Sequence, residues 1–370
     1  MTALSTEELI ALEDAFERLL QDRCTEQHVR AWMEERRGYD DELWQAMAAM
    51  GITGLMVDEA YGGTGAGPVA VERVMERAGS ALLGAPLLTS AVMAVAALNA
   101  SDDEDARARL LPGIAAGDRI ATLLITGPGG AWTAEDVAVR AEQKDGNWHL
   151  TGTSSFVLHG RSADVWLAVA NCDAGPTLFE LAPQSAGVSC TPLPSFDHTL
   201  VLDEIVLSDT PASQVGDAGA GWQAVQHAMD HGIVALAGEQ AGGARRILEI
   251  AVEYAKIRHQ FGRPIGSFQA IKHMAADLLL EVESAVSAAR QAATTTDARA
   301  EDANVWRCLA GFACADAYAR AAADAVQMHG GIAFTWEHPA HLYLRRSRAC
   351  AQLFGSSDAY RERYLQALGG

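Results

Sequence analysis

Arginine side chains gather at two places in this sequence, and both places carry donors suited to an anionic ligand. One is the turn RHQFGR, which begins at Arg258 and ends at Arg263, and the other is the run of Arg345, Arg346 and Arg348. A guanidinium offers a planar fork of N–H donors that matches phosphate or carboxylate oxygens. The second run also fits a simpler interpretation, a solvated helix face whose arginines pair with acidic side chains.

The remainder of the chain is strongly acidic. Its 370 residues carry 28 lysines and arginines against 48 aspartates and glutamates, which gives a formal net charge of −20. Such a chain is a poor candidate for binding nucleic acid or an anionic membrane, because both need a basic face. An anionic ligand must therefore meet a local concentration of arginine or lysine. The length and the 49% hydrophobic content predict two or three globular domains.

Other patterns carry less chemistry. Residues 63–68 (GTGAGP) look like part of a dinucleotide loop, but a third glycine and a preceding strand are missing. His338 and His341 have zinc-site spacing, yet Pro339 lies between them and no carboxylate accompanies them as a third ligand in the right frame, which favours a surface pair and no metal. The 6 cysteines are scattered without a CxxC motif, which favours free thiols in a reducing cytoplasm.

These residues must be positioned by elements whose periodicity changes twice along the chain. Residues 1–118 show helical spacing, beginning with a helix that Ser5 can cap. The uncharged stretch 78–101 is rich in alanine and contains Pro86, which predicts a buried helix–turn–helix and no membrane span. Further helices are expected near residues 40–50, 69–78, 81–98 and 103–116.

The middle region, residues 119–214, predicts an antiparallel β sandwich or barrel made of short strands. These are expected at residues 120–125, 137–141, 148–150, 165–170, 177–181 and 204–207. Residues 215–370 return to helical spacing and predict an antiparallel four-helix bundle. Its helices are expected at 222–261, 268–294, 303–329 and 339–368.

Three motifs in this α+β order resemble the acyl-CoA dehydrogenase family. Residues 258–273 (RHQFGRPIGSFQAIKH) are similar to the family's R-x-x-F-G-x-x-I-x-x-x-Q segment, and residues 327–334 (QMHGGIAF) to its Q-x-x-G-G-x-G-aromatic turn. Residues 59–65 (EAYGGTG) match in the N-terminal domain. The resemblance covers essentially the whole chain. It implies a cytoplasmic FAD enzyme that desaturates an acyl-CoA and assembles with homologous subunits.

The resemblance also implies roles for the residues of these motifs. Arg258 would pair with the FAD pyrophosphate, Phe261 would offer an apolar face, and Gly330 and Gly331 would let the backbone approach the cofactor. Amide side chains would donate hydrogen bonds to it: Gln260, Gln269 and Gln327. In the family this arm serves the flavin of a neighbouring subunit. The structural alternative is that Arg258 pairs with a helix-surface acid and Gly331 only ends a helix.

The catalytic base is where the sequence departs from the family. The family reaction needs a carboxylate beside the substrate α carbon, usually within an aromatic–Glu–Gly–Thr turn. Counting without gaps from Gln327 puts Phe354 at that position, and counting back from Arg258 puts Gly232 at the position used by a minority of members. Neither residue can accept a proton. Glu239 and His231 are weak substitutes, and a buried Glu239 that pairs with an arginine is the favoured structural interpretation.

The flavin-facing segments of the β domain depart as well. The family's T-E-P-x-A-G-S-D loop corresponds to residues 126–132, which keep Thr126 but put Trp132 in the place of a serine. The W-I-T-N segment corresponds to residues 156–159, in which Phe156 can stack but Leu158 cannot hydrogen-bond a flavin. The arm is therefore intact while the chain's own pocket is eroded.

Three hypotheses follow from this imbalance. The first is a subunit of a mixed α2β2 acyl-CoA dehydrogenase, of the kind found in bacterial sterol side-chain degradation, that completes the FAD site of its partner. The second is a self-sufficient dehydrogenase with an unusual base. The third is an interaction protein on the same fold that binds no flavin. The sequence does not indicate which acyl-CoA is used.

Overall fold

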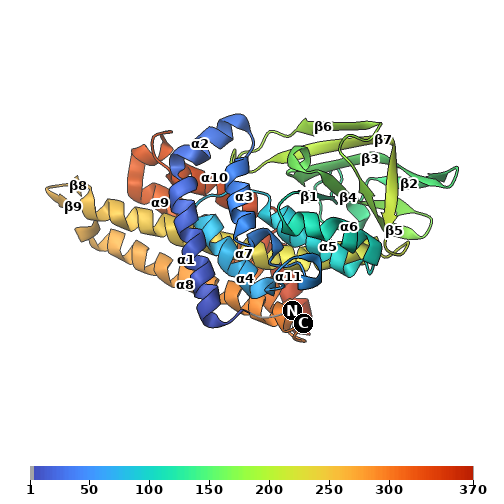
Figure 1. Ribbon diagram of the computed structural model, residues 1–370. Helices are drawn as coiled ribbons and strands as arrows, with labels where there is room; N and C mark the ends of the chain where they lie inside the picture. The colour runs from blue at the N-terminus through green and yellow to red at the C-terminus, as the bar shows by residue number, and fades with distance from the viewer. Residues whose placement is uncertain (1–3, 370) are drawn as a thin grey trace.

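A computed structural model describes residues 4–369, which form a helical layer, a β barrel and a long helical bundle (Figure 1). The N-terminal helices are α1 (Thr6–Arg23), α2 (Glu26–Glu35), α3 (Asp41–Ala49), α4 (Gly67–Ser80), α5 (Val95–Ala100) and α6 (Glu104–Ala115). Ser5 caps α1 by accepting a hydrogen bond from the Glu8 N–H, and the Glu8 carboxylate accepts one from the Ser5 N–H in return. The prediction of this cap is confirmed, whereas α2 was not predicted.

The uncharged stretch is buried, as predicted. After α4 ends at Ser80, the chain turns and forms the π-helical segment η3 (Leu87–Ala94), which continues into α5. Every residue of η3 is buried. Within residues 4–369, no helix is long and apolar enough to cross a membrane.

The middle region forms a closed barrel in which neighbouring strands follow the ring β4–β2–β3–β7–β5–β4. The strands are β1 (Ala121–Leu124), β2 (Arg140–Lys144), β3 (Asn147–Leu158), β4 (Val165–Cys172), β5 (Gly175–Leu181), β6 (Val188–Pro192) and β7 (Leu202–Val215). The predicted all-antiparallel sheet is wrong, because β1 pairs with β4 in parallel. Strand β6 was missed because this polar, half-exposed edge strand lacks an apolar run.

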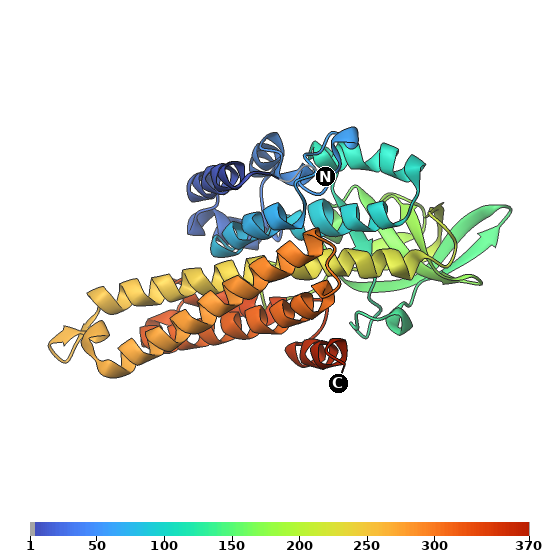
Figure 2. The same ribbon diagram turned by 90° about the horizontal axis from the view of Figure 1, so that it is seen from below.

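The C-terminal helices are α7 (Gly221–Ile257), α8 (Gln269–Asp297), α9 (Ala303–His329), α10 (Ala340–Cys350) and α11 (Ser357–Ala367). Helix α7 runs from beside the barrel to a projecting tip, where the short strands β8 (His259–Gln260) and β9 (Arg263–Pro264) connect it to α8 (Figure 2). The prediction of one helix over 339–368 is wrong. The chain leaves the helix because Phe354 has φ +63° and Gly355 has φ +132°.

Close contact between α4 and α7 joins the N-terminal helices to the bundle. A Cβ atom on Gly79 would lie 1.9 Å from the Glu239 carbonyl oxygen, and one on Gly242 would lie 1.8 Å from that of Glu76. Only glycine permits backbones to approach so closely. The two helices therefore fix each other's position along their length.

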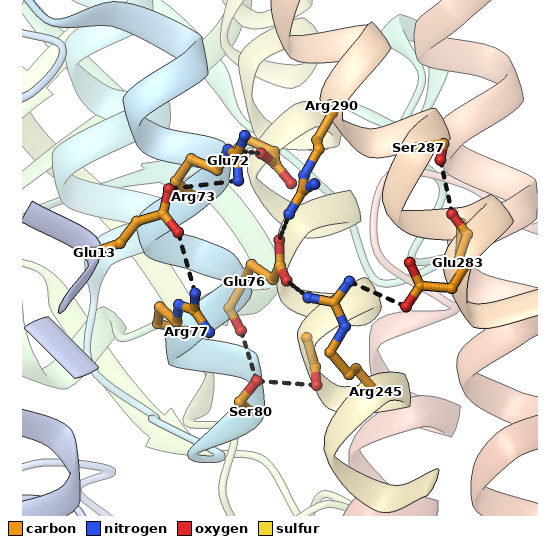
Figure 3. Close-up of polar contacts among 12 residues, drawn as sticks. Glu13, Glu72, Arg73, Glu76, Arg77, Ser80, Arg245, Glu283, Ser287 and Arg290 are labelled. Atoms are coloured by element: carbon orange, nitrogen blue, oxygen red, sulfur yellow. Dashed lines mark hydrogen bonds and ion pairs between the residues drawn. The ribbon is translucent and has the colours of Figure 1, made fainter. Parts of the chain in front are cut away.

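Beside this contact lies a network of ion pairs (Figure 3). Glu76, on α4, accepts hydrogen bonds from Arg245 of α7 and Arg290 of α8. Glu72 lies one turn earlier on α4 and is only 1% exposed. Within residues 4–369 neither of its carboxylate oxygens has a hydrogen-bond partner, and its one ion pair is a 3.6 Å contact with Nε of Arg73. Burial, followed by the neighbouring Glu76 charge, raises the pKa of Glu72 to about 8.

Glu72→Gln should stabilise the protein above pH 5. Because the folded-state pKa of Glu72 lies above its ordinary value of 4.5, its contribution to stability is fully present below that value and is lost as pH rises toward 8. The slope is at most about 1.4 kcal/mol per pH unit. We expect thermal melts to show that the melting temperature of the variant rises relative to that of the wild type between pH 5 and 8.

The matched control is Glu76→Gln, which removes the acceptor of two arginines and should destabilise the protein at every pH in this window. A melting profile of Glu72→Gln that runs parallel to the wild type across the window would contradict the prediction.

Candidate cofactor and substrate site

The two motifs of the predicted arm meet at the end of the bundle. The N–H of Arg258 donates to the Tyr254 carbonyl and closes the last turn of α7. The ring of Tyr254 lies 4.4 Å, centre to centre, from that of His329, the last residue of α9. Since His329 directly precedes Gly330, the glycine turn begins beside the last turns of α7, the helix that leads into the arginine-rich turn.

The side chains of this arm are exposed. Phe261 is 91% exposed at the tip of the hairpin, with φ +53°. Exposure extends to Arg258 and to three glutamines of the arm: Gln260, Gln269 and Gln327. Within residues 4–369 Arg258 makes no ion pair, so the alternative of a helix-surface acid as its partner is not what the structure shows. Within the described part of the chain, the donors of these arm side chains are therefore unpaired.

The glycine turn leaves its backbone open. Gly330 ends α9 with φ +67° and ψ −144°, a conformation that side chains disfavour. A Cβ atom on Gly330 or Gly331 would meet nothing within 4 Å. A ligand can therefore approach this backbone closely, and a cation, three amides, an aromatic ring and open glycines together fit a dinucleotide such as FAD.

The two positions expected for a catalytic carboxylate meet in space, although they were counted from different motifs. A Cβ atom on Gly232 of α7 would lie 3.2 Å from ring atoms of Phe354, in the break between α10 and α11. Phe354 is 1% exposed, and Trp132 contacts its ring edge-on with 4.9 Å between ring centres. Aromatic side chains therefore occupy this place, and neither position carries an acid.

Glu239 belongs to a buried ion cluster. Nη1 of Arg346 donates to its carboxylate over 2.6 Å, and Nε of Arg346 donates to Asp197 over 2.8 Å. Thr199 and the carbonyls of Leu82 and Leu83 accept from the same guanidinium. Arg346 is only 2% exposed, so the prediction of a solvated face is wrong for this residue. Helix α10 packs it against α7 and the 197–199 loop, whereas Arg348 is exposed.

His231 turns toward a different set of side chains. Its ring lies 4.7 Å from that of His227, and its Nδ1 atom is buried without a partner. Burial lowers the pKa of His231 to about 3, so the imidazole is neutral at pH 7 and a weak base. The neighbouring Asp230 pairs with Arg307 of α9 over 3.0 Å.

The β-domain residues expected to face the flavin, Thr126 and Phe156, contact other residues of the same chain. Thr126 is 2% exposed and its hydroxyl donates to the Ser155 carbonyl. Phe156, with φ +58°, lies in an irregularity of the β3–β7 pairing and is 40% exposed. A Cβ atom on Gly130 would lie 2.9 Å from its ring, so the 127–130 turn sits directly against Phe156.

Sequence reasoning missed Asp197 and Thr199 as partners of Arg346, because 149 and 147 residues separate them and no local pattern marks such a contact. It also placed His338 and His341 on the surface, whereas both are half-buried and Nε2 of His341 is enclosed without a partner. In the part of the chain that is described, no group of three or more His, Cys, Asp or Glu residues is placed to hold a metal ion.

Residues 6–118 match the family model described as "Acyl-CoA dehydrogenase, N-terminal domain", and residues 219–369 match "Acyl-CoA dehydrogenase, C-terminal domain". The chain is 32% identical over 351 residues to acyl-CoA dehydrogenase IpdE2 of Mycolicibacterium smegmatis, covering 95% of each protein. The chain belongs to the acyl-CoA dehydrogenase family.

Two solved structures are similar over nearly their whole length. One is the ChsE4-ChsE5 complex from Mycobacterium tuberculosis, with a TM-score of 0.89 and 28% identity, covering 100% of this chain and 99% of the other. The second is a variant of the Tcur3481-Tcur3483 steroid ACAD, with a TM-score of 0.87 and 27% identity, covering 98% of both chains. FAD is the cofactor that the family implies.

Glu239→Gln should destabilise the protein by about 3–5 kcal/mol, because it leaves the buried charge of Arg346 with one carboxylate fewer. Denaturant unfolding of the isolated chain measures the change. The control is Asp230→Asn, which breaks a partly exposed pair with Arg307 and should cost about 1 kcal/mol or less. Wild-type stability in Glu239→Gln would show that the carboxylate is free for another role.

Proposed function

We propose that this chain is a subunit of a heteromeric acyl-CoA dehydrogenase, in which it completes the FAD site of a partner subunit and lacks a catalytic base of its own. The observation that carries the proposal is the contrast between an exposed arm and a filled interior. Phe261 is 91% exposed while Phe354 is 1% exposed. The residues that serve a neighbour are available, and the residues of the chain's own site are packed against one another.

The exposed arm supports a role toward another subunit. A phenylalanine left in water at the tip of a hairpin gains substantial stabilisation only when a second surface buries it. Arg258 makes no ion pair within the described residues, which leaves its fork free for a pyrophosphate. FAD, when bound, accepts the hydride that leaves the β carbon of the acyl-CoA.

The filled interior supports the absence of a base. Removing the α proton requires a group that can accept it at hydrogen-bond distance. Phe354 and Gly232 lack such a group, Glu239 is held by Arg346, and the lowered pKa of His231 makes it a poor acceptor. The partner subunit must therefore supply the carboxylate.

The similar proteins extend the proposal to partner and substrate. ChsE4-ChsE5 is a complex of two differently named chains, and the Tcur3481-Tcur3483 variant is described as a steroid ACAD. We propose an acyl-CoA from lipid or sterol catabolism as the substrate and a homologous subunit as the partner. The 6 free cysteines fit a reducing compartment such as the cytoplasm.

Flavin should appear only when the chain is co-purified with a partner. The chain is expressed alone and with each acyl-CoA dehydrogenase homologue of its source genome that retains the aromatic–Glu–Gly–Thr turn, and flavin absorbance and acyl-CoA-dependent dye reduction are measured. Flavin and turnover in the lone chain would overturn the proposal in favour of a self-sufficient enzyme. Absence of flavin in every pairing would instead favour an interaction protein.

Arg258→Ala should lower the flavin content of the co-purified complex about tenfold or more, because a charge-assisted hydrogen-bond pair to phosphate is lost. The matched control is Lys256→Ala, which removes an exposed cation that pairs with Glu253 at the same helix end. Equal flavin content in Arg258→Ala and wild type would contradict the assigned role of the arm.

A further inference from the structure

An exposed aromatic cluster surrounds Arg345 beside the glycine turn. Phe196 is 60% exposed and comes from the loop between β6 and β7, whereas Trp336 is 55% exposed and follows η7 (Gly330–Phe334). The Cζ atom of Arg345 lies 4.8 Å from the ring centre of Phe196 and 5.1 Å from that of Trp336. We call Phe196, Trp336 and Arg345 the aromatic platform.

Hydrogen bonds from α10 hold the platform in place. Nη1 of Arg345 donates to the Phe196 carbonyl over 2.9 Å. The next residue along the helix, Arg346, points inward and binds Asp197 and Thr199 of the same loop. Two consecutive arginines of α10 thus hold the loop that contains Phe196, Asp197 and Thr199. Because the loop is already ordered, little conformational entropy is lost when the platform binds another surface.

Histidine rings support Trp336 as well. His198 stacks on the indole with 6.4 Å between ring centres, and His341 contacts it edge-on at 4.8 Å. The indole therefore has one side packed against the chain while more than half of its surface meets water. A large aromatic ring fixed in this way is a typical anchor of a protein interface.

Most N–H donors of Arg345 are not used by the hydrogen bond that it makes within the described residues. A guanidinium carries five N–H donors, and the hydrogen bond to the Phe196 carbonyl uses one. Within residues 4–369 no carboxylate pairs with Arg345, although the chain carries 48 acidic residues. Aromatic rings on its face and free donors on its edge suit a carboxylate that arrives with an apolar surface around it.

We infer that the aromatic platform is a binding hot spot for the homologous partner subunit, which places a carboxylate on the guanidinium of Arg345. The inference rests on the proposed heteromeric function. Trp336 lies in the same short segment as Gly330 and Gly331, so a partner whose cofactor reaches the glycine turn also covers the platform. A protein surface fits better than a nucleotide because the exposed rings come from separate segments, and Phe334, two residues before Trp336, is a further exposed ring.

The test uses the full-length chain and the homologous subunit with which it co-purifies. Arg345→Ala and Trp336→Ala should each raise the dissociation constant of the complex, measured by calorimetry, about tenfold or more. The Arg345→Ala complex should also lose part of its salt dependence, because one interfacial ion pair is missing. Thermal melts of the isolated variants check that each one folds.

The matched control is Arg363→Ala, in which the removed guanidinium lies 5.4 Å from the Tyr360 ring on α11, an arginine–aromatic contact outside the platform. It should bind the partner as the wild type does.

The outcomes separate the inference from the proposed function. Wild-type affinity in both platform variants, with flavin retained, overturns the platform and leaves the heteromer standing. Loss of flavin from an intact complex assigns the platform to the cofactor and also overturns the inference. If the wild-type chain binds no homologue, the proposed function fails and the inference fails with it.

Discussion

The buried guanidinium of Arg346 is the interaction on which the arrangement of the three regions depends. It ties α10 to Glu239 of the bundle, to Asp197 of the β-domain loop, and to the carbonyls of Leu82 and Leu83 that follow α4. A cation taken out of water is tolerated only when it is fully paired, so all these groups must be present together. The carboxylate of Glu239 balances the buried charge of Arg346, and this pairing makes Glu239 a poor candidate for the catalytic base.

Large aromatic side chains are packed in the interior of the molecule but exposed at the hairpin and the glycine turn. Between barrel and bundle, Phe354 and Trp132 fill the space that faces Gly232. At the hairpin and the glycine turn, large rings remain in water although a chain of this size has a core that could bury them. Surfaces of this kind are typical of proteins whose final burial takes place on assembly, as the proposed function requires.

Much of the fold was predictable because it follows local pattern and motif spacing. Most helices of the first region other than α2, most strands of the middle region other than β6, and the long helices α7, α8 and α9 were predicted, and the family is confirmed. The break between α10 and α11 was not predicted, although Gly355 is a local signal for a helix end. The parallel pairing of β1 and the contacts of Arg346 were also missed, because residues distant in the sequence determine them. The domain boundaries and the roles of the arm residues stay predictions.

The packing around the helix break also bears on how this chain can evolve. A carboxylate introduced at position 354 would enter a space bounded by Gly232, Met93 and Trp132, where burial would favour its neutral form. Regaining a working acid there requires at least a second change that opens the aromatic contact. The proposed dependence on another subunit is therefore a condition that single substitutions do not readily reverse.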